Sequence, residues 1–216
     1  MEILDIHTHH EAPQPHAVVA LRIADNYDIP RLRRTQLYSS GVHPWDTNCE
    51  ISDHDWKKLE NLAEKEEVVA LGECGIDLTP KGGPLFRQLQ VFKRQIEISE
   101  RLGKPMVIHD VKGHDIIAGA RRDFKPTQNW AIHGFRRKPE VAHMLLSAGC
   151  WLSFGPNFNP DTLRATPEDR ILAETDESDT SINQVIAALS EAYGKDLKPI
   201  IAENTRRFLG IDKEKN

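Results

Sequence analysis

The chain has 216 residues, which suits one domain with a sizeable core, and its 39% hydrophobic and 28% charged residues are typical of a globular protein. No apolar run approaches the ~18 residues of a membrane helix and the N-terminus lacks signal-peptide features, so we expect a cytoplasmic protein with no membrane partner. The net charge of −5 means that a nucleic-acid ligand would require a local basic patch. Three scattered cysteines argue against a disulfide framework and a cysteine-based zinc site.

Short apolar, β-rich segments recur along the chain and predict eight strands. They span residues 3–9, 17–23, 37–43, 68–76, 105–109, 129–135, 150–155 and 170–176. Helical patterns between and after them predict helices at residues 52–65, 85–102, 114–123, 138–148, 181–193 and 197–209. The clearest is 85–102, where Leu89, Phe92 and Ile96 lie on one face and Gly103 follows as a normal helix stop.

Strands that alternate with helices predict an α/β fold, a TIM (β/α)₈ barrel that occupies residues 1–216 as one domain. No internal repeat or linker divides the chain. Only about seven residues separate the first two predicted strands, whereas a parallel connection normally takes a dozen or more. Either a short irregular segment replaces the first helix, or the second strand is misplaced.

Histidines and acidic residues gather at the carboxyl ends of the predicted strands. His7 and His9 close the first strand, and at positions i and i+2 they project from the same face. The other members of this set lie at or near the ends of later strands: Glu73, His109, His133 and Asp176. In a parallel barrel all these ends meet at one mouth, where the catalytic loops sit. A single strand-end histidine is commonly structural, but six such side chains at one mouth predict a metal centre.

Four imidazoles and two carboxylates exceed the needs of one tetrahedral zinc ion, and the set contains no thiolate. Two divalent ions about 3.5–4 Å apart, bridged by a carboxylate and a water, account for the surplus. We expect Glu73 to bridge, because a carboxylate offers one oxygen to each ion. The remaining ligands divide into His7, His9 and Asp176 for one ion, and His109 and His133 for the other. A hydroxide bound to the ions would be the nucleophile and Asp176 could accept the water's proton, which is the chemistry of a hydrolase.

Successive segments of the chain resemble, in order, the motifs of the TatD family of metal-dependent deoxyribonucleases. They are DIHTHH, GVHP, ALGECGID, LFRQLQVFKRQIEISERLGKPMVIH, IHGF, WLSFGP, ILAETD and IAENTRRFLG, and they cover almost the whole chain. The resemblance implies an amidohydrolase-like TIM barrel with a divalent-metal site. The ligands that it implies fall on the six positions found above: His7, His9, Glu73, His109, His133 and Asp176.

The chain departs from this family pattern in its loops. The segment between DIHTHH and GVHP is shorter than usual, which agrees with a shortened or missing first helix. Val111 stands where the family commonly has arginine, Gly134 replaces the cysteine that usually follows the histidine of IHGF, and Glu177 replaces the alanine that usually follows Asp176. Because all six ligand positions are kept while the loops differ, metal-dependent hydrolysis is better supported than DNA as the substrate.

Basic side chains beyond the ligand strands are candidates for holding phosphate oxygens. Arg136, Arg137 and Lys112 lie three or four positions after a predicted ligand. Each could contact a phosphate or belong to the solvated start of a helix. His43, at the end of the third predicted strand, could contact substrate or merely pack.

Three further side chains have both a functional and a structural interpretation. Asp77 could orient the end of the strand that carries Glu73, and Glu174 could hydrogen-bond a ligand histidine. Trp45 could stack on a base or pack in the rim.

These features predict a deoxyribonuclease that cleaves phosphodiester bonds of DNA, acting on single-stranded ends. The alternative is a metal-dependent amidohydrolase or deacylase that attacks a C–N or carboxyl-ester bond with the same centre. The basic residues after His133 favour the first, because a neutral amide does not need them. A non-catalytic binding barrel is disfavoured because all predicted ligands are present. Magnesium, manganese and zinc all fit as the two ions, and the sequence indicates no obligate protein partner.

Overall fold

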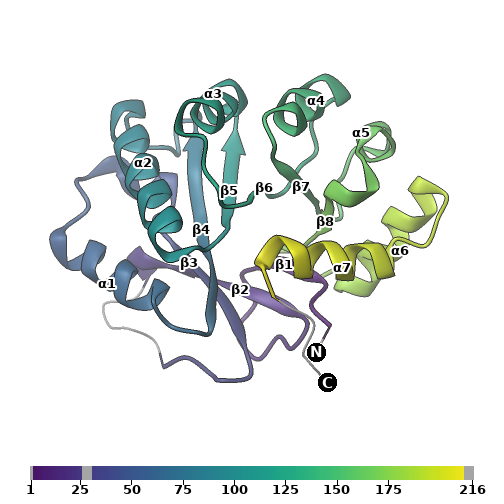
Figure 1. The fold of residues 1–216 in the computed structure, drawn as a ribbon, viewed down its shortest axis with the longest axis horizontal. Coiled ribbons are helices and arrows are strands. Elements are labelled where there is room, and N and C mark those ends of the chain that lie inside the picture. The colour runs from purple at the N-terminus through teal and green to yellow at the C-terminus, as the bar shows by residue number, and fades with distance from the viewer. Residues whose placement is uncertain (1, 26–30, 212–216) are drawn as a thin grey trace.

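Eight parallel strands, ordered β1 to β8 around one sheet, form the centre of the structure (Figure 1). They span Asp5–Thr8 (β1), Ala17–Arg22 (β2), Leu37–Gly41 (β3), Val68–Asp77 (β4), Met106–Val111 (β5), Trp130–Ile132 (β6), Trp151–Phe154 (β7) and Ile171–Ala173 (β8). This computed structural model describes residues 2–25 and 31–211. The predicted TIM barrel is confirmed, and each predicted strand segment overlaps one observed strand.

Helices connect most of the strands and surround them. They are α1 (Asp53–Ala63), α2 (Leu85–Leu102), α3 (His114–Phe124), α4 (Pro139–Ser147), α5 (Pro160–Ala165), α6 (Ile182–Tyr193) and α7 (Lys198–Leu209), with short 3₁₀ helices η1 (Ile23–Asp25), η2 (Pro44–Asn48) and η3 (Glu168–Arg170). The sequence predicted all of the α-helices except α5, whose six residues are too few for a periodic pattern. Among the described helices, none is long and apolar enough to cross a membrane.

The first connection of the barrel is irregular. β2 pairs in parallel with both β1 and β3, so the second predicted strand is correctly placed. The described residues between β1 and β2 contain no helix, and those between β2 and β3 contain only η1. The predicted loss of the first helix is therefore confirmed, and a short irregular segment takes its place.

The barrel closes between β1 and β8 through the backbone of Asp176. The amide of Asp176 donates to the carbonyl of His7 at 3.0 Å, and the amide of His9 donates to the carbonyl of Asp176 at 3.0 Å. One residue earlier, the Thr175 hydroxyl donates to Asp5 Oδ2 at 2.6 Å. The closing contact therefore holds three of the predicted metal ligands at the mouth of the barrel.

Two glycines explain how β4 presents Glu73. Gly72 and Gly75 have φ angles of +139° and +140°, and a Cβ at either would lie 2.4 Å from the Val107 carbonyl oxygen or 2.2 Å from that of His109. Only glycine fits where β5 approaches so closely. The pairing of β4 with β5 also shifts register between Leu71 and Cys74, so the backbone around Glu73 is set by this local irregularity.

Helix α2 packs on the barrel and hydrogen-bonds to the backbone at the ends of β3 and β4. Phe92 packs against Trp130 of β6, with ring centroids 5.4 Å apart. The buried amide of Gln95 accepts from the Val42 N–H at 2.9 Å and donates to the Val42 carbonyl at 3.1 Å, which fixes the chain just before His43. Gln88 makes the corresponding pair with the backbone of Asp77, with both distances 2.8 Å.

We predict that Gln95→Leu lowers the free energy of unfolding by about 2–4 kcal/mol, because it leaves the buried Val42 N–H and carbonyl without partners at ~1–3 kcal/mol each. Urea denaturation followed by circular dichroism measures the change. The control is Gln90→Leu, an exposed position on the same helix, where we expect a change within about 0.5 kcal/mol. Equal effects of the two substitutions would contradict a role for Gln95 in fixing the loop.

Candidate metal centre

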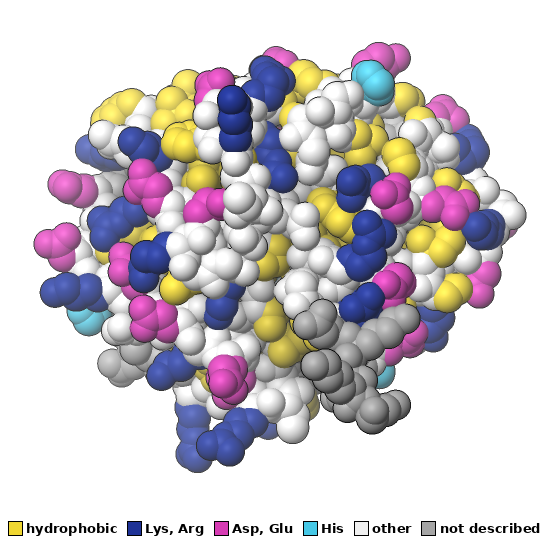
Figure 2. All heavy atoms as spheres, viewed as in Figure 1, with side chains coloured by type: hydrophobic (Ala, Val, Ile, Leu, Met, Phe, Trp, Pro, Cys, Tyr) yellow, Lys and Arg dark blue, Asp and Glu magenta, His cyan; other side chains and the backbone are white. Residues whose placement is uncertain are grey.

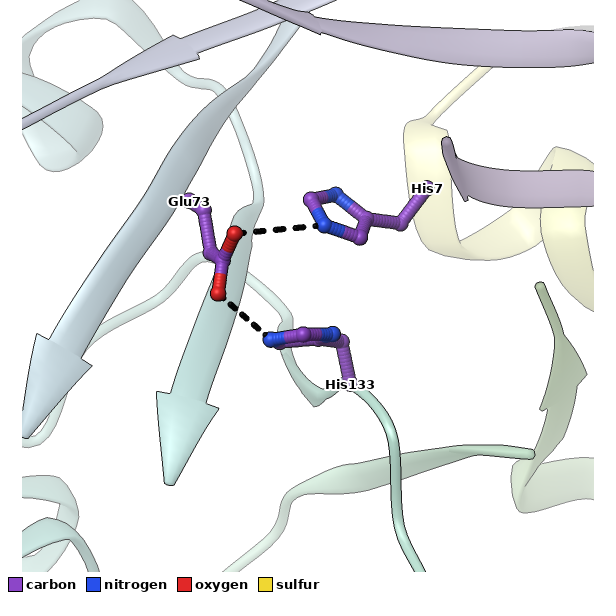
Figure 3. A group of neighbouring side chains, drawn as sticks. All are labelled: His7, Glu73 and His133. Atoms are coloured by element: carbon purple, nitrogen blue, oxygen red, sulfur yellow. Dashed lines mark hydrogen bonds and ion pairs between the residues drawn. The ribbon is translucent and has the colours of Figure 1, made fainter. Parts of the chain in front are cut away.

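Imidazoles and carboxylates converge at the mouth of the barrel around Glu73, which is 7% exposed. The side chains of this Glu73 cluster are His7, His9, Glu73, His43, His109, His133 and Asp176. Figure 3 shows the arrangement at its centre, where Glu73 lies between His7 and His133 and directs one oxygen toward each.

The two oxygens of Glu73 face different groups of histidines. Oε2 lies 3.4 Å from His7 Nε2 and 3.2 Å from His9 Nε2. Oε1 lies 2.5 Å from His109 Nδ1 and 2.7 Å from His133 Nε2. His43 Nε2 also lies 3.1 Å from Oε1. One carboxylate therefore separates His7 and His9 from the imidazoles on the Oε1 side, which is the arrangement that a bridging ligand between two ions requires.

Asp176 completes the Oε2 side. Its Oδ1 lies 3.8 Å from the Nε2 atoms of both His7 and His9, and 42% of its side chain is exposed. Its φ of +54° is a left-handed conformation that aspartate tolerates better than most residues. Asp176 is thus the part of the cluster most open to substrate and solvent.

The donor set fits divalent metal ions. His7 is fully buried, yet among the described residues neither of its ring nitrogens has a hydrogen-bond partner, which is costly for a buried polar group. Two nitrogen ligands ~2.0–2.1 Å from one zinc ion at tetrahedral angles lie roughly 3.3 Å apart, close to the spacings around Glu73. His7, His9 and Asp176 form one group with metal-ligand spacing, and His7, Glu73 and His133 form another.

Carboxylates outside the cluster orient two of the histidines. Asp77 Oδ2 lies 3.2 Å from His109 Nε2, and Glu174 Oε1 lies 3.3 Å from His133 Nδ1. Each ring donates its N–H to that carboxylate and turns its other nitrogen toward Glu73, as metal-ligating histidines commonly do. The sequence left open whether Glu174 hydrogen-bonds a ligand histidine, and in the structure it contacts His133. Asp77 was expected to orient the strand that carries Glu73, and in the structure its side chain contacts His109.

His43 has a different hydrogen-bonding pattern. Its Nδ1 accepts from the Trp45 amide at 3.1 Å, so a neutral ring carries its proton on Nε2, 3.1 Å from Glu73 Oε1. Burial lowers the pKa of His43, although Glu73 opposes this, so the neutral form is favoured. His43 is therefore placed as a hydrogen-bond donor into the cluster. Its Nε2 also lies 3.4 Å from His109 Nδ1.

Electrostatics within the cluster favour an ionised carboxylate. Burial alone would raise the pKa of Glu73, but His133, His109 and His43 hold it well below its usual range. For His133, burial opposes the charged form, and the carboxylates of Glu73 and Glu174 nevertheless raise its pKa well above the ordinary value. The cluster thus attracts positive charge, which a divalent ion would supply in place of protons.

The structure brings all six predicted ligands together, although four of the predicted site residues lie just beyond the end of the strand that was predicted to contain them. β1 ends at Thr8, one residue before His9. β6 ends at Ile132, just before His133, and β8 ends at Ala173, three residues before Asp176. β3 ends at Gly41, so His43 instead caps the following 3₁₀ helix η2. Their roles as ligands or substrate contacts stay predictions.

The predicted basic residues differ in their closeness to the cluster. A cleft of about 140 Å³ is lined by His109, His133, Arg136, Arg137 and Asp176 among others. Arg136 is exposed, whereas Arg137 is half-buried, and Lys112 follows β5 in left-handed backbone outside this cleft. On the face in Figure 2, basic and acidic side chains are interspersed.

The sequence left open whether Trp45 stacks on a base or packs in the rim. Its indole N–H donates to Asp77 Oδ2 at 2.6 Å, and the Lys81 ammonium lies 4.5 Å from the ring centroid. Because Asp77 also contacts His109, Trp45 supports the orientation of that histidine. No local pattern identifies this role, since it depends on a contact between η2 and the end of β4, 32 residues apart.

Comparison with known proteins places these observations in a family. The family described as TatD related DNase matches residues 14–210. The metal-dependent hydrolase YcfH of Escherichia coli K12 is 29% identical over 193 residues, which cover 85% of this chain and 69% of that protein. The protein named 3'-5' ssDNA/RNA exonuclease TatD of Erwinia billingiae is 33% identical over 149 residues, covering 64% of this chain and 56% of that protein.

A solved structure shares the fold. That of YjjV, a TatD homolog from Escherichia coli K12, matches 97% of this chain and 98% of its own with a TM-score of 0.80, at 19% identity.

We predict that metal-free protein titrated with Mn²⁺ or Zn²⁺ in a calorimeter binds two equivalents, and that Glu73→Gln loses at least one. Replacing one oxygen by an amide removes a ligand atom but keeps the shape of the side chain. The control is Glu97→Gln on the exposed face of α2, for which both equivalents should remain. Two equivalents in the Glu73→Gln variant would contradict the bridging role.

Proposed function

The chain belongs to the TatD-related DNase family of metal-dependent hydrolases, and from this premise we propose that it hydrolyses phosphodiester bonds at single-stranded DNA ends with two divalent ions. One observation carries the proposal: the two oxygens of Glu73 face separate groups of imidazoles. A hydrolase with a single ion would not need this division.

The residues of the Glu73 cluster divide between the two ions as the distances suggest. The proposed ligands are His7, His9 and Asp176 on the Oε2 side, His109 and His133 on the Oε1 side, and Glu73 between them. Bound there, divalent ions polarise a phosphoryl oxygen and lower the pKa of water toward neutrality. Magnesium, manganese and zinc remain the candidates, because the imidazoles suit zinc and the carboxylates suit all three.

Proton transfer in this proposal falls to Asp176. Its carboxylate is the most exposed of the cluster, and its Oδ1 lies on the side of His7 and His9. From there it accepts the proton of the attacking water. His43, with its proton on Nε2, is placed to donate a hydrogen bond to a phosphate oxygen, which agrees with its predicted contact with substrate.

Substrate binding in this proposal uses the basic residues beside the cleft. Arg136 and Arg137 line it together with His109 and His133, so a phosphate near the ions lies within reach of their guanidinium groups. The name of the Erwinia billingiae relative, an ssDNA/RNA exonuclease, supports a nucleic-acid substrate. Lys112, outside the cleft, would contact a more distant phosphate.

The direct test uses metal-free protein reloaded with single metals. It is assayed against end-labelled single- and double-stranded DNA and against a panel of amides and carboxyl esters. We expect metal-dependent degradation of single-stranded DNA. Cleavage of amides or esters with intact DNA would instead establish the amidohydrolase or deacylase alternative.

We predict that Asp176→Asn lowers kcat for an oligonucleotide by ~10²–10⁴-fold, because the amide does not accept the proton of water. Metal content measured by elemental analysis should fall by less than one equivalent. The control is Asp179→Asn, an exposed acidic position three residues farther on, for which we expect near-normal turnover. Near-normal turnover of Asp176→Asn with metal bound would show that Asp176 is not the proton acceptor.

We also predict that the double variant Arg136→Ala, Arg137→Ala raises KM for single-stranded DNA and flattens the slope of log affinity against log salt by ~0.7 for each lost phosphate contact. Cleavage of bis(p-nitrophenyl) phosphate should stay nearly intact. The matched control is Arg33→Ala, Arg34→Ala, an adjacent exposed pair before β3, which should leave both substrates unaffected. A double variant with an unchanged salt slope would assign Arg136 and Arg137 to the solvated surface.

A further inference from the structure

His10 follows the first strand and is not a member of the Glu73 cluster. Its side chain is half-buried, and its Nε2 lies 2.8 Å from the backbone carbonyl oxygen of Ser178. Because a carbonyl oxygen only accepts, the ring donates the proton that Nε2 carries. This hydrogen bond joins two segments 168 residues apart in the sequence, the one that follows β1 and the one that follows β8.

The segment after β8 forms a tight turn that contains Asp176. The Ser178 amide donates to the Thr175 carbonyl at 2.9 Å, so Asp176 and Glu177 occupy the two central positions of the turn. The φ of Asp176 is +54°, a left-handed conformation that persists where surrounding contacts hold it. The direction of the Asp176 carboxylate therefore depends on how this turn is held.

The near end of the turn is bonded to β1 and to the residue that follows it. The Asp176 amide donates to the His7 carbonyl, and the Asp176 carbonyl accepts from the His9 amide, both at 3.0 Å. The Thr8 hydroxyl donates to the same Asp176 carbonyl at 3.2 Å. These bonds fix the backbone of Asp176 itself, but they do not restrain the residues that come after it.

The far end of the turn depends on His10. Within residues 2–25 and 31–211, the bond from His10 to Ser178 is the only hydrogen bond that joins residues 177–180 to a part of the chain outside residues 175–181. The His10 amide in turn donates to the Thr8 hydroxyl at 3.3 Å, which ties His10 to the first strand. The turn is thus bonded to the β1 segment on both sides of the Asp176 side chain.

We propose that His10 is a positioning residue for Asp176. By holding Ser178, it keeps the turn closed and the Asp176 carboxylate beside the Nε2 atoms of His7 and His9, each 3.8 Å from Oδ1. The inference rests on the proposed function, in which Asp176 is a metal ligand and the proton acceptor. His10 acts through the turn rather than as a ligand, so its loss should weaken the metal site that includes Asp176 and leave the other site unchanged.

Four variants separate this role from a general effect on folding. His10→Leu removes the donor, whereas His10→Gln keeps one, because the glutamine amide can take the place of Nε2. Asp176→Gly removes the carboxylate and tolerates the left-handed backbone. His16→Leu is the matched control, because His16 also lies 2.8 Å from a backbone carbonyl, that of Glu2, at the amino-terminal end of the strands.

Manganese titration of metal-free protein in a calorimeter gives the first readout. In His10→Leu we expect one equivalent to bind about 10–100-fold more weakly, the loss typical when a group that orients a metal ligand is removed, and the other to bind as in the wild type. His10→Gln should restore the wild-type affinity, and His16→Leu should not change it. Because both substitutions act on one carboxylate, His10→Leu should cause no further weakening in the Asp176→Gly background.

Hydrogen–deuterium exchange of the metal-free protein gives a second readout that requires neither metal nor substrate. The amides of residues 176–180 should exchange faster in His10→Leu, because the far end of the turn is released. They should exchange at the wild-type rate in His10→Gln and in His16→Leu.

Unchanged exchange at residues 176–180, or unchanged affinity for both ions, in His10→Leu would overturn the inference, as would equal weakening of both ions. A further loss of affinity in the Asp176→Gly background would show that His10 does not act through the carboxylate. Asp176→Gly that binds both ions as tightly as the wild type would overturn the proposed ligand and this inference with it. Weaker binding by Asp176→Gly but not by His10→Leu would overturn this inference alone.

Discussion

The pairing of the buried Glu73 carboxylate with the surrounding histidines is the interaction around which the rest of the site is arranged. Burial of an unpaired charge is costly, so the two oxygens of the carboxylate need positive partners or donors on both sides. Histidines from separate strand ends meet that need, two at each oxygen, with His43 as an additional donor. Glycines at 72 and 75 let β4 carry this carboxylate against β5, so the backbone that forms the strand also determines where the charge lies.

The contacts that close the barrel also assemble one side of the site. Asp176 joins β8 to β1 through backbone hydrogen bonds with His7 and His9, and its side chain lies beside the rings of those two histidines. Loss of packing at this junction would therefore separate proposed ligands as well as strands. Function and stability are coupled at Asp176, whereas on the Oε1 side the histidines are oriented by separate carboxylates, Asp77 and Glu174.

Much of the fold and of the ligand set could be predicted because both depend on short-range patterns. Strands as apolar as β4 and helices as periodic as α2 are visible in single segments, and polar residues at strand ends meet at one mouth in any parallel barrel. The boundaries near His43 and Asp176 were less accurate. β3 ends two residues before His43, and β8 ends three residues before Asp176, whose left-handed backbone has no signal in the apolar pattern.

The remaining features depend on contacts between segments distant in the sequence. The pairing of Asp77 with His109 and Trp45 needs β4, β5 and η2 to meet, and the tautomer of His43 follows from a single backbone amide. The pocket lined by Gly134, Gly155 and Asp176 likewise exists only where the loops after β6, β7 and β8 come together. None of these has a spacing that a sequence pattern could reveal.

Anomalous diffraction from crystals of the protein grown with manganese shows directly whether Glu73 bridges two ions. We predict two peaks about 3.5–4 Å apart, one on each side of the Glu73 carboxylate. The first should lie beside His7, His9 and Asp176, and the second beside His109 and His133. A single peak coordinated by only one oxygen of Glu73, or no peak within reach of that carboxylate, would contradict it.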